Sequence, residues 1–117
     1  MSAGVLVPVS MPAEARELIQ ELGLRGPVEE MIEHTRQAVA GLRSIEIEAW
    51  YEHEEDRTPL PHVTVIGWRD GHRSAADDVT EREWFEWAVR TYPPEVKLHL
   101  SFALQCLAVA DIRARFP

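Results

Sequence analysis

Residues 44–52 read SIEIEAWYE, a run in which apolar and acidic side chains alternate. Successive side chains of a strand point to opposite faces of a sheet, so Ile45 and Ile47 fall on one side and the glutamates at 46 and 48 on the other. The alternation predicts a half-buried strand with one dry face and one wet face.

A second strand is predicted over residues 62–69, which read HVTVIGWR. Its valines and aromatic residue suit a pleated, half-buried surface. Pro59 and Pro61 lie between the two strands, where a loop tolerates residues that lack an amide donor. Together the two strands predict an antiparallel hairpin.

Helical patterns lie on both sides of this hairpin. Apolar side chains recur at helical spacing over residues 11–22 and again over 27–39, which predicts a packed pair of helices before the hairpin. A third helix is predicted over 81–91, because Thr80 and Glu83 have the spacing of a capping box.

After two prolines, residues 100–108 alternate as a last strand would, although their alanines also suit a buried helix. With a strand here, the fold class is α+β: a two-layer sandwich of order ααββαβ, whose three-stranded mixed sheet carries helices on one face. A right-handed crossover through the third helix would set the last strand parallel to the second.

The composition bounds the class of protein. The chain has 117 residues, with 12 basic and 20 acidic side chains and a net charge of −8, so we expect one domain over residues 1–117 with a flexible segment over 1–10. A strongly acidic chain does not suit a nucleic-acid backbone, because such binding relies on clustered lysine and arginine. We therefore expect no nucleic-acid partner.

The location is predicted from two further features. The first residues lack the pattern of a secretory signal, and no apolar run is long enough for a membrane span, so no membrane association is expected. Cys106 is the single cysteine, which favours a buried thiol in the reducing cytoplasm.

Acidic residues are concentrated on the predicted hairpin. Six carboxylates and Arg57 give residues 44–60 a net charge of −5. The run is typical of a solvated strand face and loop that discourage edge pairing, but it would also serve as a docking surface for a basic protein partner. The sequence leaves both interpretations open.

Two histidines flank the predicted hairpin loop. If the hairpin closes between His53 and His62, then Glu55 and Asp56 could join them around one divalent metal ion. The spacing matches no established zinc signature, and a slip of one residue in the strand register would separate the two histidines. A metal-binding protein or metal-dependent enzyme is therefore the alternative hypothesis, and otherwise no cofactor is expected.

Aromatic residues suggest where a protein contact would lie. If the first strand alternates, one of Trp50 and Tyr51 faces the core and the other is exposed beside Glu48 or Glu52, which predicts these four residues as a partner or dimer contact. Trp84 on the third helix is expected to pack in the core.

No catalytic motif is present in the sequence. No serine has the glycine-flanked setting of a nucleophile elbow, and the glycines are scattered singly rather than gathered in a phosphate loop. The leading hypothesis is a small, acidic, cytoplasmic and non-catalytic interaction or regulatory protein, which forms a homodimer through the open face or an edge of its sheet.

Overall fold

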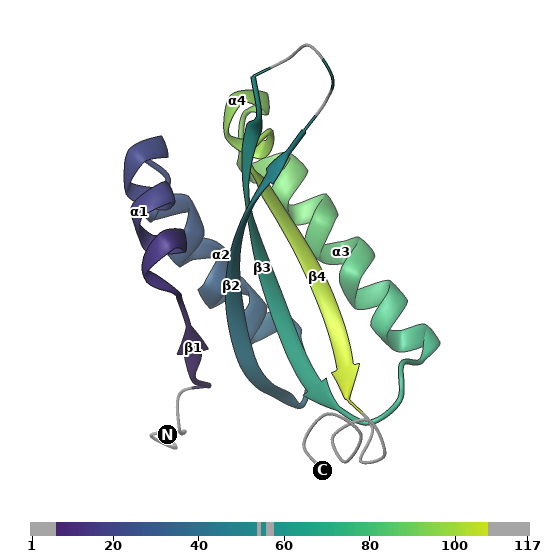
Figure 1. Cartoon of the computed structure of the whole chain (residues 1–117). Coiled ribbons are helices and arrows are strands. Elements are labelled where there is room, and N and C mark those ends of the chain that lie inside the picture. The colour runs from purple at the N-terminus through teal and green to yellow at the C-terminus, as the bar shows by residue number, and fades with distance from the viewer. Residues whose placement is uncertain (1–6, 54, 56–57, 108–117) are drawn as a thin grey trace.

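The computed structural model describes residues 7–53, 55 and 58–107. Within these residues, helices cover one face of a mixed four-stranded sheet with the strand order β1-β2-β3-β4, which confirms the α+β fold class (Figure 1). No helix in this part of the chain is long and apolar enough to cross a membrane. The elements are β1 (Val9–Ser10), α1 (Ala13–Leu22), α2 (Arg25–Ala38), β2 (Leu42–Glu52), β3 (Leu60–Asp70), α3 (Ala75–Thr91), α4 (Pro94–Lys97) and β4 (Leu100–Leu107).

The predicted hairpin is confirmed. β2 and β3 are antiparallel, with Ile47 opposite Val65 and Glu48 opposite Thr64. Ile47 and Val65 are fully buried beneath the helices, as the alternation in β2 predicted. β4 runs parallel to β3, in agreement with the predicted crossover through α3.

The prediction of three strands is wrong, because β1 adds a fourth. Val9 pairs with Ile45 in parallel register, and the Ile45 amide donates to the Pro8 carbonyl at 2.9 Å. A strand of two residues is too short to show any alternation in the sequence. The element order is therefore βααββααβ rather than ααββαβ. A flexible segment was expected over residues 1–10. Residues 1–6 lie outside the described part of the chain, and Val9–Ser10 form β1.

α3 begins at Ala75, earlier than the predicted residue 81. Its capping box is formed by Ser74 and Asp77, with the Ser74 amide donating to Asp77 Oδ2 at 2.8 Å. The predicted box of Thr80 and Glu83 is wrong, because Thr80 lies inside the helix and its hydroxyl donates to a carbonyl one turn back. A cap six residues upstream of the predicted one lengthens the helix by the same number of residues.

The other predicted boundaries differ by a few residues. α1 lies within the predicted range 11–22, and α2 begins at Arg25, two residues before the predicted start at Pro27. β4 agrees with the predicted range 100–108, whose last residue lies outside the described part of the chain.

Trp84 fills the layer between helices and sheet, as predicted. It is 1% exposed and stacks on Phe102 of β4 with the ring centres 4.4 Å apart. Its Nε1–H donates to the buried Thr35 Oγ1 at 3.1 Å, and the Thr35 hydroxyl in turn donates to the Met31 carbonyl at 2.7 Å. The Trp84 indole and the Thr35 hydroxyl are therefore satisfied without water.

The outer edge of β4 is held by side chains. The Leu104 amide donates to Glu81 Oε2 at 3.1 Å, and the Leu104 carbonyl accepts from Arg73 Nη1 at 2.8 Å. Both outward backbone groups of this residue are thus occupied. Such a contact blunts a sheet edge that would otherwise be open to pairing.

Candidate interaction surface

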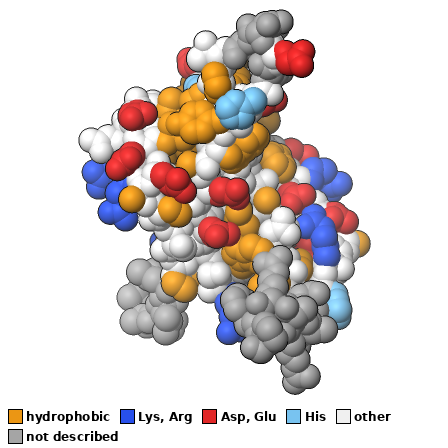
Figure 2. Space-filling model, in the orientation of Figure 1, with side chains coloured by type: hydrophobic (Ala, Val, Ile, Leu, Met, Phe, Trp, Pro, Cys, Tyr) orange, Lys and Arg blue, Asp and Glu red, His pale blue; other side chains and the backbone are white. Residues whose placement is uncertain are grey.

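The sheet face opposite the helices, here called the open face, is the surface on which sequence-predicted contact residues gather. Its side chains alternate along each strand with the buried residues that pack on the helices. Figure 2 looks onto this face. It consists of Ser44, Glu46, Glu48, Trp50 and Glu52 on β2, His62, Thr64, Ile66 and Trp68 on β3, and Ser101, Ala103, Gln105 and Leu107 on β4.

Charge is unevenly distributed over the open face. The carboxylates of Glu46, Glu48 and Glu52 all belong to β2, whereas the facing residues of β4 carry no charge. Figure 2 shows carboxylates and hydrophobic side chains side by side here, with lysine and arginine at the margins of the view. The face therefore has an acidic side along β2 and a neutral side along β4.

Trp50 and His62 form a stacked pair at the hairpin end of the open face. They are directly opposite each other on β2 and β3, and their ring centres are 4.3 Å apart with the planes at 14°. Glu52 Oε2 lies 3.0 Å from His62 Nε2. Trp50 is 39% exposed, so one side of its ring is available to solvent or to a partner.

A chain of hydroxyl groups continues from this pair across the sheet. Trp50 Nε1–H donates to Thr64 Oγ1 at 2.8 Å, and Thr64 Oγ1 lies 2.7 Å from Ser101 Oγ. These bonds cross three strands and fix the orientation of the indole. The serine and threonine are bonded to each other rather than to a histidine base, which is not the arrangement of an activated nucleophile.

The neutral side of the open face is apolar at its centre. Ile66 is 8% exposed but lies outside the helix-facing core, and Ala103 is directly beside it on β4. Trp68 flanks Ile66 along β3, and its Nε1–H donates to Glu46 Oε1 at 3.2 Å. The alternation over residues 62–69 also places Ile66 and Trp68 on this side of the sheet. The predicted set of contact residues did not include them.

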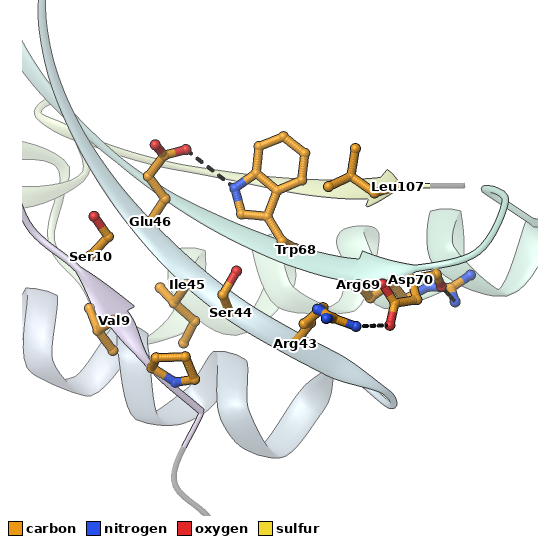
Figure 3. Close-up of a pocket in the computed structure, with 11 residues that line it drawn as sticks. Val9, Ser10, Arg43, Ser44, Ile45, Glu46, Trp68, Arg69, Asp70 and Leu107 are labelled. Atoms are coloured by element: carbon orange, nitrogen blue, oxygen red, sulfur yellow. Dashed lines mark hydrogen bonds and ion pairs between the residues drawn. The ribbon is translucent and has the colours of Figure 1, made fainter. Parts of the chain in front are cut away.

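A shallow pocket of about 440 Å³ lies at the other end of the open face, where β1, β2 and β3 meet (Figure 3). The Trp68 ring and Leu107 contribute apolar surface to it. The charged groups Arg43 and Asp70 at its margin are paired with each other at 2.7 Å. The pocket offers an apolar depression beside a satisfied ion pair, which is suited to packing rather than to acid–base chemistry.

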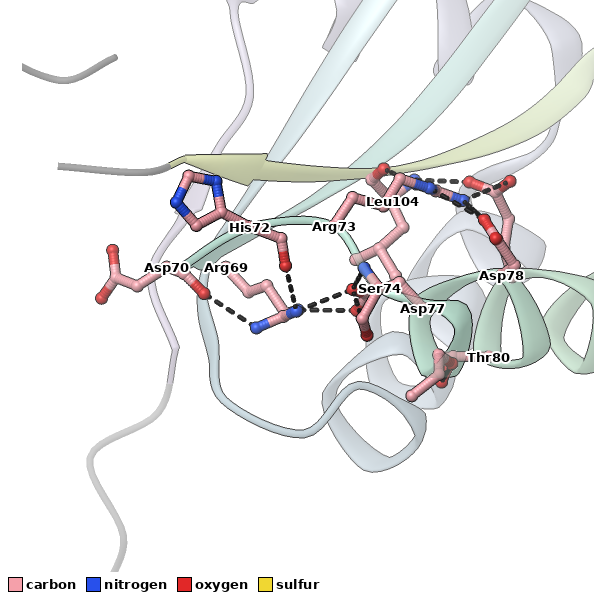
Figure 4. Close-up of polar contacts among 11 residues, drawn as sticks. Arg69, Asp70, His72, Arg73, Ser74, Asp77, Asp78, Thr80 and Leu104 are labelled. Carbon is pink, nitrogen blue, oxygen red and sulfur yellow. Dashed lines mark hydrogen bonds and ion pairs between the residues drawn. The ribbon is translucent and has the colours of Figure 1, made fainter. Parts of the chain in front are cut away.

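The most extensively bonded polar cluster lies at the start of α3 and fixes the turn after β3 (Figure 4). Arg69 holds the buried Asp77 with two bonds, Nε to Oδ1 at 2.6 Å and Nη2 to Oδ2 at 2.7 Å. Hydrogen bonds from Arg69 and Ser74 keep the pKa of the Asp77 carboxyl well below its usual range. The carboxylate is ionised and fully engaged, so we assign it to stability.

Cys106 lies near this cluster and is half-buried. Burial and the nearby Asp77 carboxylate raise the pKa of the Cys106 thiol. A raised pKa keeps the group protonated near neutral pH, and a protonated thiol is a poor nucleophile.

The four predicted contact residues do not all share one surface. Trp50, Glu48 and Glu52 lie together on the open face, but Tyr51 is on the opposite side of β2. Both aromatic residues are exposed, at 39% and 50%, so the expectation that one of them is buried is wrong. At this end of β2, both side chains remain exposed among the described residues, whichever side of the strand they lie on.

The predicted metal ligands are not brought together among the described residues. The partner of His62 is Glu52 rather than His53, and Asp56 lies outside the described residues. No group of three His, Cys, Asp or Glu side chains in the described part of the chain could hold a metal ion. The metal hypothesis stays a prediction, since Asp56 was one of its four ligands.

No protein-family model matches this chain, and no curated protein is similar enough to it to count as a relative.

Proposed function

We propose that this chain is a cytoplasmic, non-catalytic interaction module that self-associates through the open face of its sheet. One observation carries the proposal: helices cover one face of the sheet, while no described helix or strand covers the other face, whose centre is formed by Ile66 and Ala103. A second copy of the chain is the simplest cover for such a face, because most soluble oligomers are symmetric assemblies of one chain.

The distribution of charge supports a two-fold arrangement. Ile66 and Ala103 lie toward the β4 side of the open face, and the glutamates lie along β2. A two-fold axis over the apolar side would bring these two residues of each copy together. It would keep the two acidic strands at opposite margins, where their repulsion is screened by solvent.

The test is the oligomeric state of an Ala103→Arg variant, measured by sedimentation velocity over a series of micromolar concentrations. We expect the unmodified protein to sediment as a dimer and the variant as a monomer, because the arginine would bury an unpaired charge in the interface. Val89→Arg is the matched control, since Val89 is a 60% exposed apolar residue on α3. This control variant should remain dimeric.

Circular dichroism establishes that both variants are folded. An unmodified protein that stays monomeric throughout the concentration series would contradict the proposal. So would an Ala103→Arg variant that dimerises as strongly as the Val89→Arg control.

A further inference from the structure

The outer edge of β2 is only partly paired. β1 pairs with β2 as far as Ser10 and Glu46, and Pro12 then leads into α1, which turns the chain away from the sheet. Figure 1 shows the short β1 beside the lower part of β2. From Ala49 to Glu52, β2 is hydrogen-bonded to β3 on one side, and no described strand lies on its other side.

The backbone groups that point outward along this edge can be assigned. The amide of Ile45 donates to Pro8 of β1, so residues in phase with Ile45 direct their backbone groups away from β3. Ala49 and Tyr51 are in phase with it and lie beyond β1. Their outward amides and carbonyls have no partner among the described residues, and they form a template for one more strand.

The two edges of the sheet differ in this respect. At the β4 edge, Arg73 and Glu81 occupy both backbone groups of Leu104. At the β2 edge, no described side chain bonds to the backbone of Ala49 or Tyr51. Residues 49–52, where β2 continues beyond β1, are here called the free edge.

The side chains beside the free edge indicate which kind of strand could bind there. Glu48 and Glu52 project onto the open face at alternate positions with Trp50 between them, and both glutamates are exposed. Glu52 uses Oε2 for His62, which leaves Oε1 available. An added strand with basic side chains on the same face would meet a carboxylate, an indole ring and a second carboxylate in turn.

We propose that the free edge binds an extended segment of a partner protein by strand addition, and that this segment carries basic residues at every second position. Main-chain hydrogen bonds to Ala49 and Tyr51 would supply the pairing, and salt bridges to Glu48 and Glu52 would set the register. The residues that alternate with the basic ones in the partner segment would lie on the same side of the sheet as Tyr51. The exposed Tyr51 ring favours an apolar neighbour there.

A second copy of this chain does not fit the same edge. Two β2 strands paired there would bring the glutamates of both copies onto one face of a continuous sheet, and like charges on neighbouring strands are destabilising. The proposal thus goes beyond self-association, which uses the apolar side of the open face. Each of the two interactions can be present without the other.

The probe is a capped heptapeptide of alternating arginine and valine, and its binding is measured by isothermal titration calorimetry. The comparison peptide has the same composition arranged as one block of arginine and one block of valine. We expect the alternating peptide to bind about tenfold more tightly, a difference of about 1.4 kcal/mol. Equal affinities would overturn the proposal, because charge attraction alone does not distinguish the two sequences.

Backbone methylation tests the strand geometry without changing the protein. In one isomer of the alternating peptide, the methylated amides face β2, and in the other they face solvent. Binding should be lost in the first isomer and retained in the second, since only inward amides donate to the free edge. Loss in both isomers or in neither would contradict strand addition.

Two protein variants locate the site. Glu48→Gln with Glu52→Gln should weaken binding of the alternating peptide about tenfold, the equivalent of two exposed ion pairs of about 0.7 kcal/mol each. Glu17→Gln with Glu21→Gln is the charge-matched control on the exposed side of α1. An equal loss in both double variants would show a nonspecific charge effect and overturn the assignment to this edge.

A third variant removes one outward donor. Ala49→Pro deletes the amide on the free edge but leaves the ladder with β3 intact, because an edge strand tolerates proline where its amide faces outward. We expect peptide binding to be lost while the sedimentation behaviour of the protein is unchanged. That second readout separates failure of this inference from failure of the proposed self-association.

Discussion

The indole ring of Trp50 lies flat against the imidazole of His62 across the β2–β3 hairpin, with the ring centres 4.3 Å apart. The two residues are directly opposite in the strand register, and neither is covered by a helix. The contact orders the end of the hairpin from the open side of the sheet. It also holds the histidine beside Glu52, 3.0 Å from the carboxylate.

Replacing His62 by alanine should lower the free energy of unfolding by about 1 kcal/mol, because a stacked ring pair contributes about that much beyond its buried area. Urea denaturation measures the change. His53→Ala is the control, since His53 is exposed just past the end of β2. Equal effects of the two substitutions would show that the stack does not stabilise the hairpin.

Asp77→Asn should be among the more damaging single substitutions on the sheet-to-helix turn. It weakens a two-point ion pair with Arg69 and removes the charge from a buried capping carboxylate, at a cost of about 2–3 kcal/mol. Asp78→Asn alters an exposed partner of Arg73 on the same turn of α3 and should cost less than about 1 kcal/mol. Denaturation midpoints that fall equally would contradict this assignment.

Two glycine substitutions are expected to differ in their effect on stability. A Cβ atom at Gly67 would lie 3.3 Å from side-chain atoms of Leu42 and Thr35, so Gly67→Ala should destabilise the protein by about 1–3 kcal/mol through overpacking. A Cβ atom at Gly26, in α2, meets nothing within 4 Å. Gly26 is the second residue of α2 and directly precedes Pro27, which disfavours a Cβ on a helical residue, so Gly26→Ala should change stability by less than about 0.5 kcal/mol. Thermal unfolding of both variants distinguishes the two effects.

His34 should make stability depend on pH in the mildly acidic range. Burial lowers its pKa, and its ring stacks on Trp87 with the centres 3.8 Å apart. The unfolded chain then binds the proton at a higher pH than the folded chain, so the free energy of unfolding falls as the pH drops below about 6.5. His34→Gln should flatten this part of the pH profile, measured by urea denaturation. A profile unchanged by the substitution would assign the dependence to other groups.

The metal hypothesis has a direct test in equilibrium dialysis against zinc. Since His62 pairs with Glu52 and not with His53, we expect no stoichiometric zinc to be retained. One ion retained per chain, and lost on replacing both histidines by alanine, would reverse this expectation and make the hairpin loop the functional site.

The parts of the fold that were predictable from the sequence are those with a sustained period. The alternation around Ile47 and Val65 gave the hairpin and its buried side, and the crossover rule gave the direction of β4. β1 could not be recognised, because two residues have no period. The start of α3 was predicted too late, at residue 81, although Ser74 and Asp77 also have the spacing of a capping box.

The candidate site was predictable in part. Alternation places Trp50, Glu48 and Glu52 on one strand face, and the structure agrees. The exposure of both Trp50 and Tyr51 depends on where the helices end relative to β2, which no local pattern encodes. The pairing of His62 with Glu52 depends on the hairpin register, which the strand patterns define only to within one residue.

The two side chains that hold Leu104 have a consequence for the size of any assembly. A sheet that can accept strands at both edges can grow without limit into a fibre. Here a strand approaching β4 at Leu104 would first have to displace Arg73 and Glu81 from the backbone, which opposes growth of the sheet at that edge. Strand addition is therefore expected at the β2 edge rather than at both edges, which works against fibre growth even at high concentration.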